Sequence, residues 1–217
     1  MIIKEITLFT NNIENQKQFY QNVLDLELVY NSEEKISFNT QGSILTFEYK
    51  KETKPSHIAF NIYSNKIEEA LIWLKKRVPI LPDGERLISD FKSWNAKAIY
   101  FYDADKNIIE FIARKNLGLV AKSVFSPKSI LSISEMAIAT TNIEGVYNAI
   151  NSIKAIPVFD GDFSRFCALG NDEGLFILIN KSIKKWHPTQ EVAYTSDFII
   201  KGDYNFSFIN GEIKELS

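Results

Sequence analysis

The predicted elements of this chain recur in a fixed order, and this repeat restricts the fold more than any single element does. Residues 3–49 are predicted as a strand, a helix and three strands, and residues 57–113 follow the same order. Glu135–Glu144 can be laid over Glu5–Glu14 at an offset of 130, with Glu, Thr, Asn, Ile and Glu coinciding. Each unit has an apolar sheet face that it cannot bury alone, so the units must pack against one another.

Apolar spacing and turn residues give the boundaries of the elements. In the first half, helices are predicted at 13–24 and 66–77, and strands at 3–10, 26–30, 35–39, 44–49, 57–62, 97–102 and 107–113. In the second half, a helix is predicted at 144–153, and strands at 156–159, 164–169, 175–180, 191–195, 198–200, 205–209 and 212–216. Turn chemistry around 114–130 predicts a domain of residues 1–116, a connector of 117–130, and a degenerate second domain of 131–217 whose last module lacks its helix.

Composition excludes several classes of function. The 217 residues carry a net charge of -2, which gives no electrostatic reason to bind nucleic acid or an anionic membrane. The single cysteine, Cys167, excludes a disulfide framework and a cysteine zinc site, and its apolar surroundings predict a buried thiol. The sequence shows neither a signal peptide nor an apolar run long enough to span a bilayer, so we expect a cytoplasmic location.

Two short apolar runs each contain one ionisable residue. His57 lies in Ser56–Ile62, and Glu110 lies in Asn107–Ile112. Strands of this kind bury one or both faces, and an isolated buried charge is costly. The simplest partner that an imidazole and carboxylates share is a divalent metal ion, so these runs predict a metal site.

Three segments of the first half resemble a known family. Phe19–Tyr30 is similar to its helix-to-strand stretch, with Asp25 where glycine is usual, and His57–Phe60 is similar to the opening strand of its second module. Tyr100–Phe111 is similar to its terminal hairpin, although two turn residues differ from the usual proline and glycine. The chain thereby resembles the vicinal oxygen chelate superfamily of glyoxalase I, fosfomycin and bleomycin resistance proteins and extradiol dioxygenases. The likeness covers residues 4–113, and extends to 131–217 only through the repeat.

The resemblance implies an α+β fold in which paired βαβββ modules form open, cup-shaped mixed sheets with helices on the outer face. It also implies a divalent metal ion (Zn, Ni, Mn or Fe) in the cup, with Glu5, His57 and Glu110 as ligands by position. Either carboxylate, Glu5 or Glu110, would then be the catalytic base. Thr46 falls where glyoxalase I has a further carboxylate, and Glu48 lies two residues on.

Two functions follow from this resemblance. The first is a metal-dependent lyase, isomerase or dioxygenase acting on a small molecule with vicinal oxygens. The second is a metal-free protein that binds or sequesters a small molecule, as bleomycin resistance proteins do, because fold alone does not decide function. Family members often pair modules between chains, which implies a homodimer. The residues predicted to line the cup are Phe9, Thr46, Glu48, Asn61, Tyr100 and Tyr102.

Other interpretations of the same residues stay open at this point. Glu5 taken alone is typical of a solvated surface, and Glu110 could pair with a lysine. In the second half, three carboxylates fall at the positions of Glu5, His57 and Glu110, namely Glu135, Glu191 and Glu215. We expect that half to close the cup, and His187 to lie on a surface loop.

Overall fold

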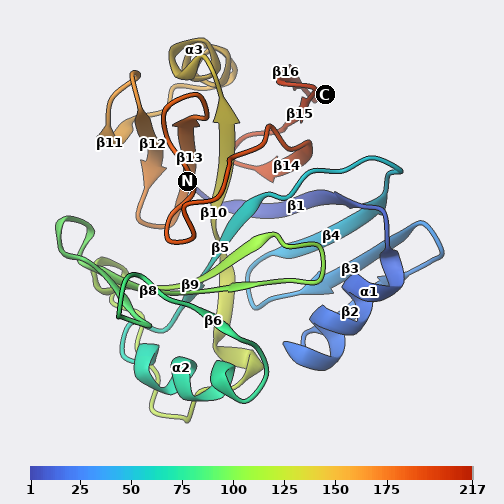
Figure 1. Cartoon of the computed structure of the whole chain (residues 1–217), viewed down its shortest axis with the longest axis vertical. Helices are drawn as coiled ribbons and strands as arrows, with labels where there is room; N and C mark the ends of the chain where they lie inside the picture. The colour runs from blue at the N-terminus through green and yellow to red at the C-terminus, as the bar shows by residue number, and fades with distance from the viewer. Residues whose placement is uncertain (217) are drawn as a thin grey trace.

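The computed structural model describes residues 1–216, and its strands join into one sixteen-stranded sheet built from four modules (Figure 1). The first module contains β1 (Ile3–Thr10), α1 (Ile13–Gln18, continued as a π-helical turn over Phe19–Val23), β2 (Glu27–Asn31), β3 (Lys35–Asn39) and β4 (Ile44–Tyr49). The second contains β5 (His57–Ile62), α2 (Ile67–Lys75), β6 (Ile80–Leu81), β7 (Ser89–Phe91), β8 (Ala96–Tyr102) and β9 (Ile108–Arg114).

The third module contains β10 (Ile130–Thr140), α3 (Ile143–Ile153), β11 (Val158–Gly161), β12 (Phe166–Asn171) and β13 (Gly174–Asn180). The fourth contains only β14 (Phe198–Gly202), β15 (Phe206–Ile209) and β16 (Glu212–Glu215), and the described residues include no helix there. None of the helices in residues 1–216 is long and apolar enough to cross a membrane.

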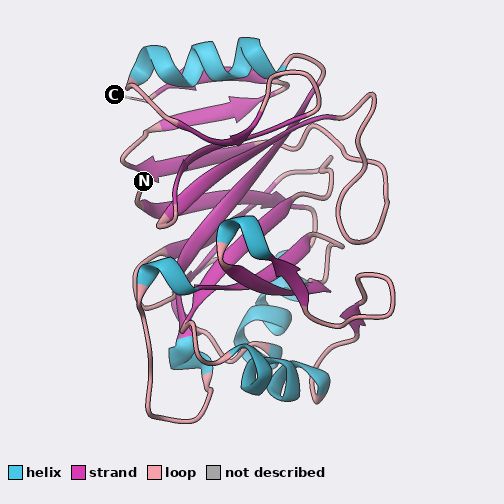
Figure 2. Cartoon of the chain, turned by 90° about the vertical axis from the view of Figure 1, so that its left-hand side faces the viewer, coloured by secondary structure: helices cyan, strands magenta, loops and turns pink. Residues whose placement is uncertain are grey.

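In each module that has a helix, the first and last strands are parallel neighbours: β1 with β4, β5 with β9, and β10 with β13. A parallel connection needs a crossover, which the helix supplies. Figure 2 shows the long strands through the middle of the molecule, with a long helix above them and further helices below. The predicted α+β fold of βαβββ modules with outer helices is confirmed, because each helix connects parallel strands of one mixed sheet.

The modules pair in a nested order. β5 of the second module pairs antiparallel with β10 of the third, and β1 of the first pairs antiparallel with β14 of the fourth. One bridge, Ile3 to Ile133, joins β1 to β10. The cup next to His57 is therefore built by the second and third modules of one chain. The predicted division at residues 117–130 stays a prediction, and the sheet itself continues across it.

The concave face of the second and third modules has small side chains along its centre. A hydrophobic cluster there includes seven alanines, namely Ala59, Ala96, Ala98, Ala137, Ala139, Ala168 and Ala193. The larger cluster, which includes the apolar faces of the helices, is rich in phenylalanine, with Phe60, Phe111 and Phe176 fully buried. Because alanine leaves space above a sheet, the cup has room for polar side chains and a cavity.

Residues 181–197 connect the third module to the fourth and contain no strand. A strand predicted at 191–195 is therefore wrong, and the fourth module begins at β14. The backbone there closes a turn instead, in which the Trp186 N–H donates to the Glu191 carbonyl at 3.0 Å. The segment buries Trp186 and Ala193 in the alanine-rich cluster, so it covers part of the cup. Glu191 consequently does not occupy a strand position equivalent to His57.

Candidate metal centre

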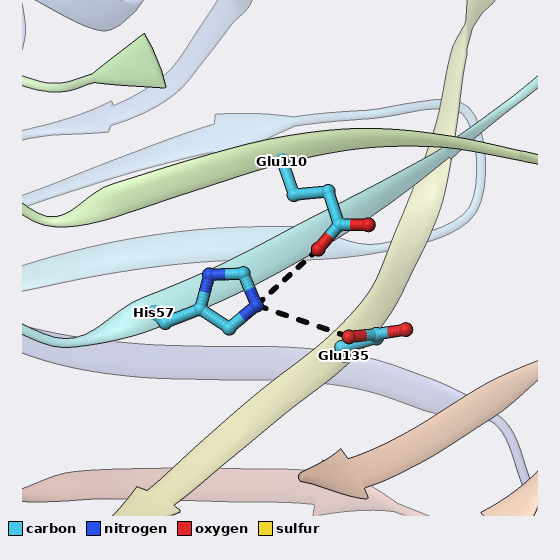
Figure 3. Close-up of side chains that lie close together, drawn as sticks. All are labelled: His57, Glu110 and Glu135. Atoms are coloured by element: carbon cyan, nitrogen blue, oxygen red, sulfur yellow. Dashed lines mark ion pairs between the residues drawn. The ribbon is translucent and has the colours of Figure 1, made fainter. Parts of the chain in front are cut away.

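Three neighbouring strands bring one imidazole and two carboxylates together in the cup. Ala59 on β5 pairs in register with Glu110 on β9 and with Glu135 on β10, so the two carboxylates flank β5 near His57. The His57 Nε2 atom lies 3.3 Å from Glu110 Oε2 and 3.8 Å from Glu135 Oε2 (Figure 3). All three residues are buried, and one ligand atom from each lies within 4.8 Å of the others. Of the described residues, these alone form such a group.

The imidazole of His57 is oriented by its own strand pair. Its Nδ1 atom lies 3.0 Å from the carbonyl oxygen of Ile108, the residue opposite it on β9. A carbonyl only accepts, so Nδ1 carries the hydrogen and Nε2 faces the carboxylates. Holding one ring nitrogen on a backbone carbonyl is the usual way in which a protein prepares the other nitrogen for a metal ion.

The donor set fits a divalent cation. Ligand atoms that are each about 2.1 Å from one ion lie roughly 3–3.5 Å from one another, close to the separations between His57 Nε2 and the two carboxylates. An imidazole and two carboxylates suit Zn, Mn or Fe better than a soft ion such as Cu(I), which prefers sulfur. When bound, such an ion would act as a Lewis acid for the oxygens of a small molecule.

The buried charges of the cluster shift its protonation. Burial by itself lowers the pKa of His57, but the hydrogen bonds and negative charges of Glu110 and Glu135 outweigh burial and raise the pKa to about 9. Burial raises the pKa of Glu110, and the negative charge of Glu135 raises it further. Without a metal ion, His57 is therefore protonated at neutral pH and donates through Nε2.

A buried arginine lies behind Glu135. The Arg114 Nη2 atom donates to Glu135 Oε1, and Arg114 Nε donates to Ser134 Oγ at 3.3 Å. The guanidinium carbon also lies 5.4 Å from the centre of a Trp94 ring. Arg114 thus neutralises one of the two carboxylates and fixes how Glu135 faces the cluster.

A cavity of about 310 Å³ opens beside the cluster, and five of its fourteen lining residues are Phe, Tyr or Trp. Its wall includes the three clustered residues, and its other side chains are Phe91, Ser93, Trp94, Tyr100, Asp160, Phe166, Ile177, Ile179, Lys184, Trp186 and His187. The Trp186 ring centre lies 5.7 Å from that of His57. His187 lies on the predicted loop but is half-buried, with its Nε2 3.3 Å from Ser89 Oγ, so its side chain lines the cavity and is not a freely exposed one.

The structure does not bring Glu5 to the cluster. The Lys201 Nζ atom donates to Glu5 Oε2 at 3.1 Å, and the two residues lie opposite each other on β14 and β1. Glu135 occupies the place expected for Glu5, because β10 and not β1 lies beside β5. The sequence held the signal for this exchange, since Glu135 coincides with Glu5 in the repeat.

The predicted cup residues are dispersed. Tyr100 alone lines the cavity beside the cluster, and Tyr102 lies two residues further on β8. Asn61 lies on β5 beyond Ala59 and donates to the Glu173 carbonyl. The other three belong to the first module: Phe9 lines a different cavity, Thr46 is buried against Ser37, and Glu48 faces Lys35.

Raising the pH is expected to destabilise the metal-free protein. The folded pKa of His57, about 9, lies above its ordinary value of 6.5, so its proton contributes stability that is complete below pH 6.5 and lost as the pH rises through 9. The loss amounts to about 3 kcal/mol. Urea midpoints at pH 6 and pH 9.5, in chelator, measure it. His57→Gln should show a much smaller pH dependence, and an equal dependence in both proteins would contradict this prediction.

Comparisons with known proteins agree with this architecture. Metallothiol transferase FosB from Staphylococcus epidermidis is 34% identical over 116 residues, which is 50% of this chain and 80% of the relative. FosB from Staphylococcus haemolyticus matches to the same extent. A Bacillus subtilis structure described as a candidate dioxygenase aligns with a TM-score of 0.62 at 15% identity.

That alignment covers 85% of this chain but only 65% of the Bacillus subtilis chain, and at this identity it shows the fold alone. No family model matches the chain. The FosB likeness, which spans four fifths of each relative, and the shared fold together establish the family. The chain belongs to the vicinal oxygen chelate superfamily of glyoxalases, bleomycin resistance proteins and ring-cleaving dioxygenases.

Proposed function

We propose that this protein is a divalent-metal-dependent enzyme acting on a small molecule that presents two adjacent oxygens, with His57, Glu110 and Glu135 as metal ligands. The observation that carries the proposal is the buried cluster of one imidazole and two carboxylates on the wall of a small aromatic cavity. The FosB relatives, named as metallothiol transferases, add support for metal-dependent chemistry.

The residues around the cluster have separable roles in this proposal. His57 is oriented through Nδ1 and binds through Nε2. Glu135 is held by Arg114 through Oε1 and binds through Oε2. Glu110, which lies closer to His57 Nε2, is the carboxylate that accepts a proton from substrate. The aromatic wall excludes water from the substrate and orients it.

Metal content tests the proposal. Elemental analysis of untagged protein is expected to find near-stoichiometric Zn, Ni, Mn or Fe in the wild type, because the three donors converge in a buried site. His57→Ala should lose the metal. Glu5→Ala is the matched control and should keep it, since Glu5 pairs with Lys201 on another part of the sheet. Loss of metal in Glu5→Ala, or its absence from the wild type after reconstitution, would contradict the ligand set.

A metal-loaded protein would then be screened for thiol transfer, for isomerisation of 2-oxoaldehyde hemithioacetals and for oxidation of catechols. Comparison of wild type with Glu110→Gln separates a proton acceptor from a ligand. Loss of turnover with metal retained supports the acceptor role, and loss of both supports a ligand role alone.

One observation favours metal-free binding as the second candidate. Protonated His57 and Arg114 balance the charges of Glu110 and Glu135 without any metal ion, and the aromatic wall suits a planar apolar ligand. Absence of metal from both wild type and reconstituted protein would favour this function. Mass spectrometry of ligands retained by native protein would then identify what the cavity holds.

A further inference from the structure

A carboxylate ligand such as Glu135 brings a negative charge to the buried cluster, whereas a neutral imidazole in the same place would bring none. One arginine, Arg114, lies against this carboxylate. We propose that Arg114 offsets this charge, so that the Glu135–Arg114 pair behaves toward the metal ion as a neutral ligand and restrains the affinity of the site for divalent cations. The inference rests on the function proposed above, because it concerns the same cluster. It assigns Arg114 as a positioning residue that acts through Glu135.

The two oxygen atoms of the Glu135 carboxylate face different partners. Oε1 accepts from Arg114 Nη2, and Oε2 lies 3.8 Å from His57 Nε2. Ser134 is adjacent in the chain and accepts from Arg114 Nε, so the guanidinium is tied to the strand that carries Glu135. Guanidinium groups keep their charge in proteins. The compensation is therefore permanent and does not depend on proton uptake.

The formal charges of the metal-loaded site can be summed. With neutral His57, the two carboxylates, the guanidinium and a divalent ion leave one positive charge. Two neutral imidazoles, one carboxylate and a divalent ion leave the same charge, and two imidazole ligands with one carboxylate form a common metal site. In a buried site each unit of charge alters affinity strongly. Arg114 therefore makes this site electrostatically equivalent to that common one.

Hydrogen bonding alone does not account for a guanidinium in this place. Arg114 is fully buried, and its Nη1 atom has no hydrogen-bond partner in residues 1–216. An apolar side chain of similar volume would pack between Trp94 and the sheet without the cost of a buried charge. The favourable contact that repays this cost is the one with Glu135.

A double-mutant cycle on metal affinity tests the inference. Zn²⁺ and Mn²⁺ are titrated into metal-stripped wild type, Glu135→His, Arg114→Met and the double variant, by calorimetry and, for Mn²⁺, by electron paramagnetic resonance. Glu135→His should bind roughly 10- to 100-fold more weakly, because Arg114 then repels the ion without compensation. Adding Arg114→Met to Glu135→His should restore affinity to about that of the wild type. Arg114→Met alone should bind more tightly than the wild type.

The control variants separate the effect of the Arg114 charge on metal affinity from any effect of the substitution on folding. Arg114→Lys keeps the charge and should bind metal nearly as the wild type does, and Lys201→Met removes a cation from the distant ion pair with Glu5 and should change nothing. If circular dichroism shows that Arg114→Met is unfolded, the cycle is repeated with Arg114→Gln, whose side chain can still donate to Glu135.

The outcomes distinguish the two proposals. A double variant that binds no better than Glu135→His, or an Arg114→Met variant that binds more weakly than the wild type, would overturn the compensating role while leaving the metal site in place. A wild type that takes up neither ion would overturn both. Recovery of affinity in the double variant supports both.

Discussion

Replacing Glu135 with alanine is expected to lower the free energy of unfolding of the metal-free protein by about 3–5 kcal/mol. The change leaves the buried guanidinium of Arg114 without a counter-charge and removes one of the two carboxylates that face His57. An uncompensated buried charge is among the few causes of so large a loss from one substitution. Urea unfolding followed by tryptophan fluorescence, in chelator, measures it.

Glu5→Ala is the matched control for this substitution. Glu5 occupies the equivalent position of the repeat, but its ion pair with Lys201 is partly exposed to solvent, and such pairs contribute about 0–1 kcal/mol. If both alanine variants lost the same stability, burial of the Glu135–Arg114 pair would not be what distinguishes the two glutamates.

Asp103→Ala is expected to cost about 3 kcal/mol or more, although Asp103 lies away from the cluster. Its Oδ2 atom accepts from Gln16 Nε2 at 3.0 Å, from Tyr20 Oη at 3.1 Å and from Asn107 Nδ2 at 2.7 Å. Its Oδ1 atom accepts from the backbone N–H of Asn107 at 2.8 Å. Removing the carboxylate leaves several buried donors unpaired, each costing about 1–3 kcal/mol. Thermal and urea unfolding measure the loss.

Two substitutions close to Asp103 set limits on this loss of stability. Tyr20→Phe removes only one donor from the carboxylate and should cost about 1 kcal/mol. Asp105→Ala alters the same turn, but the Asp105 Oδ2 atom is buried without a partner among residues 1–216, so its loss should cost little. Equal losses in Asp103→Ala and Asp105→Ala would mean that turn conformation, and not the hydrogen bonds from Gln16 and Tyr20, holds the first module against the second.

Most of the fold could be predicted from the sequence because its information is local. Alternation predicted β1 at residues 3–10 and an apolar run predicted β5 at 57–62, and both are found at those bounds. The strand predicted at 191–195 as the opening of a fourth repeat unit is wrong, because this segment is a loop that buries Ala193 on the cup. A strand also needs a neighbour, and β14 already occupies the available edge of β1.

Of the site residues, only those that interrupt an apolar strand could be predicted from the sequence. His57 and Glu110 stand out because each interrupts an apolar strand. Choosing between Glu5 and Glu135 required knowing which modules pair, and strand pairing between distant segments leaves no mark in local periodicity. Arg114 ends an apolar run and has the pattern of a solvated strand end, so its burial could not be anticipated.

Because the modules pair in a nested order, the strands of the chain find their partners at different times. β5 and β10 are joined through a moderate stretch of chain, whereas β1 pairs with β14, which follows the third module and lies much further along the chain. Closing the longer loop costs more entropy, and non-local pairing is slow. During synthesis, the half that contains His57, Glu110 and Glu135 has all its strands once residue 180 has emerged, while β1 still presents an unpaired edge. β14 therefore covers that edge only after the strands of the site are complete, and until then the edge is open to association.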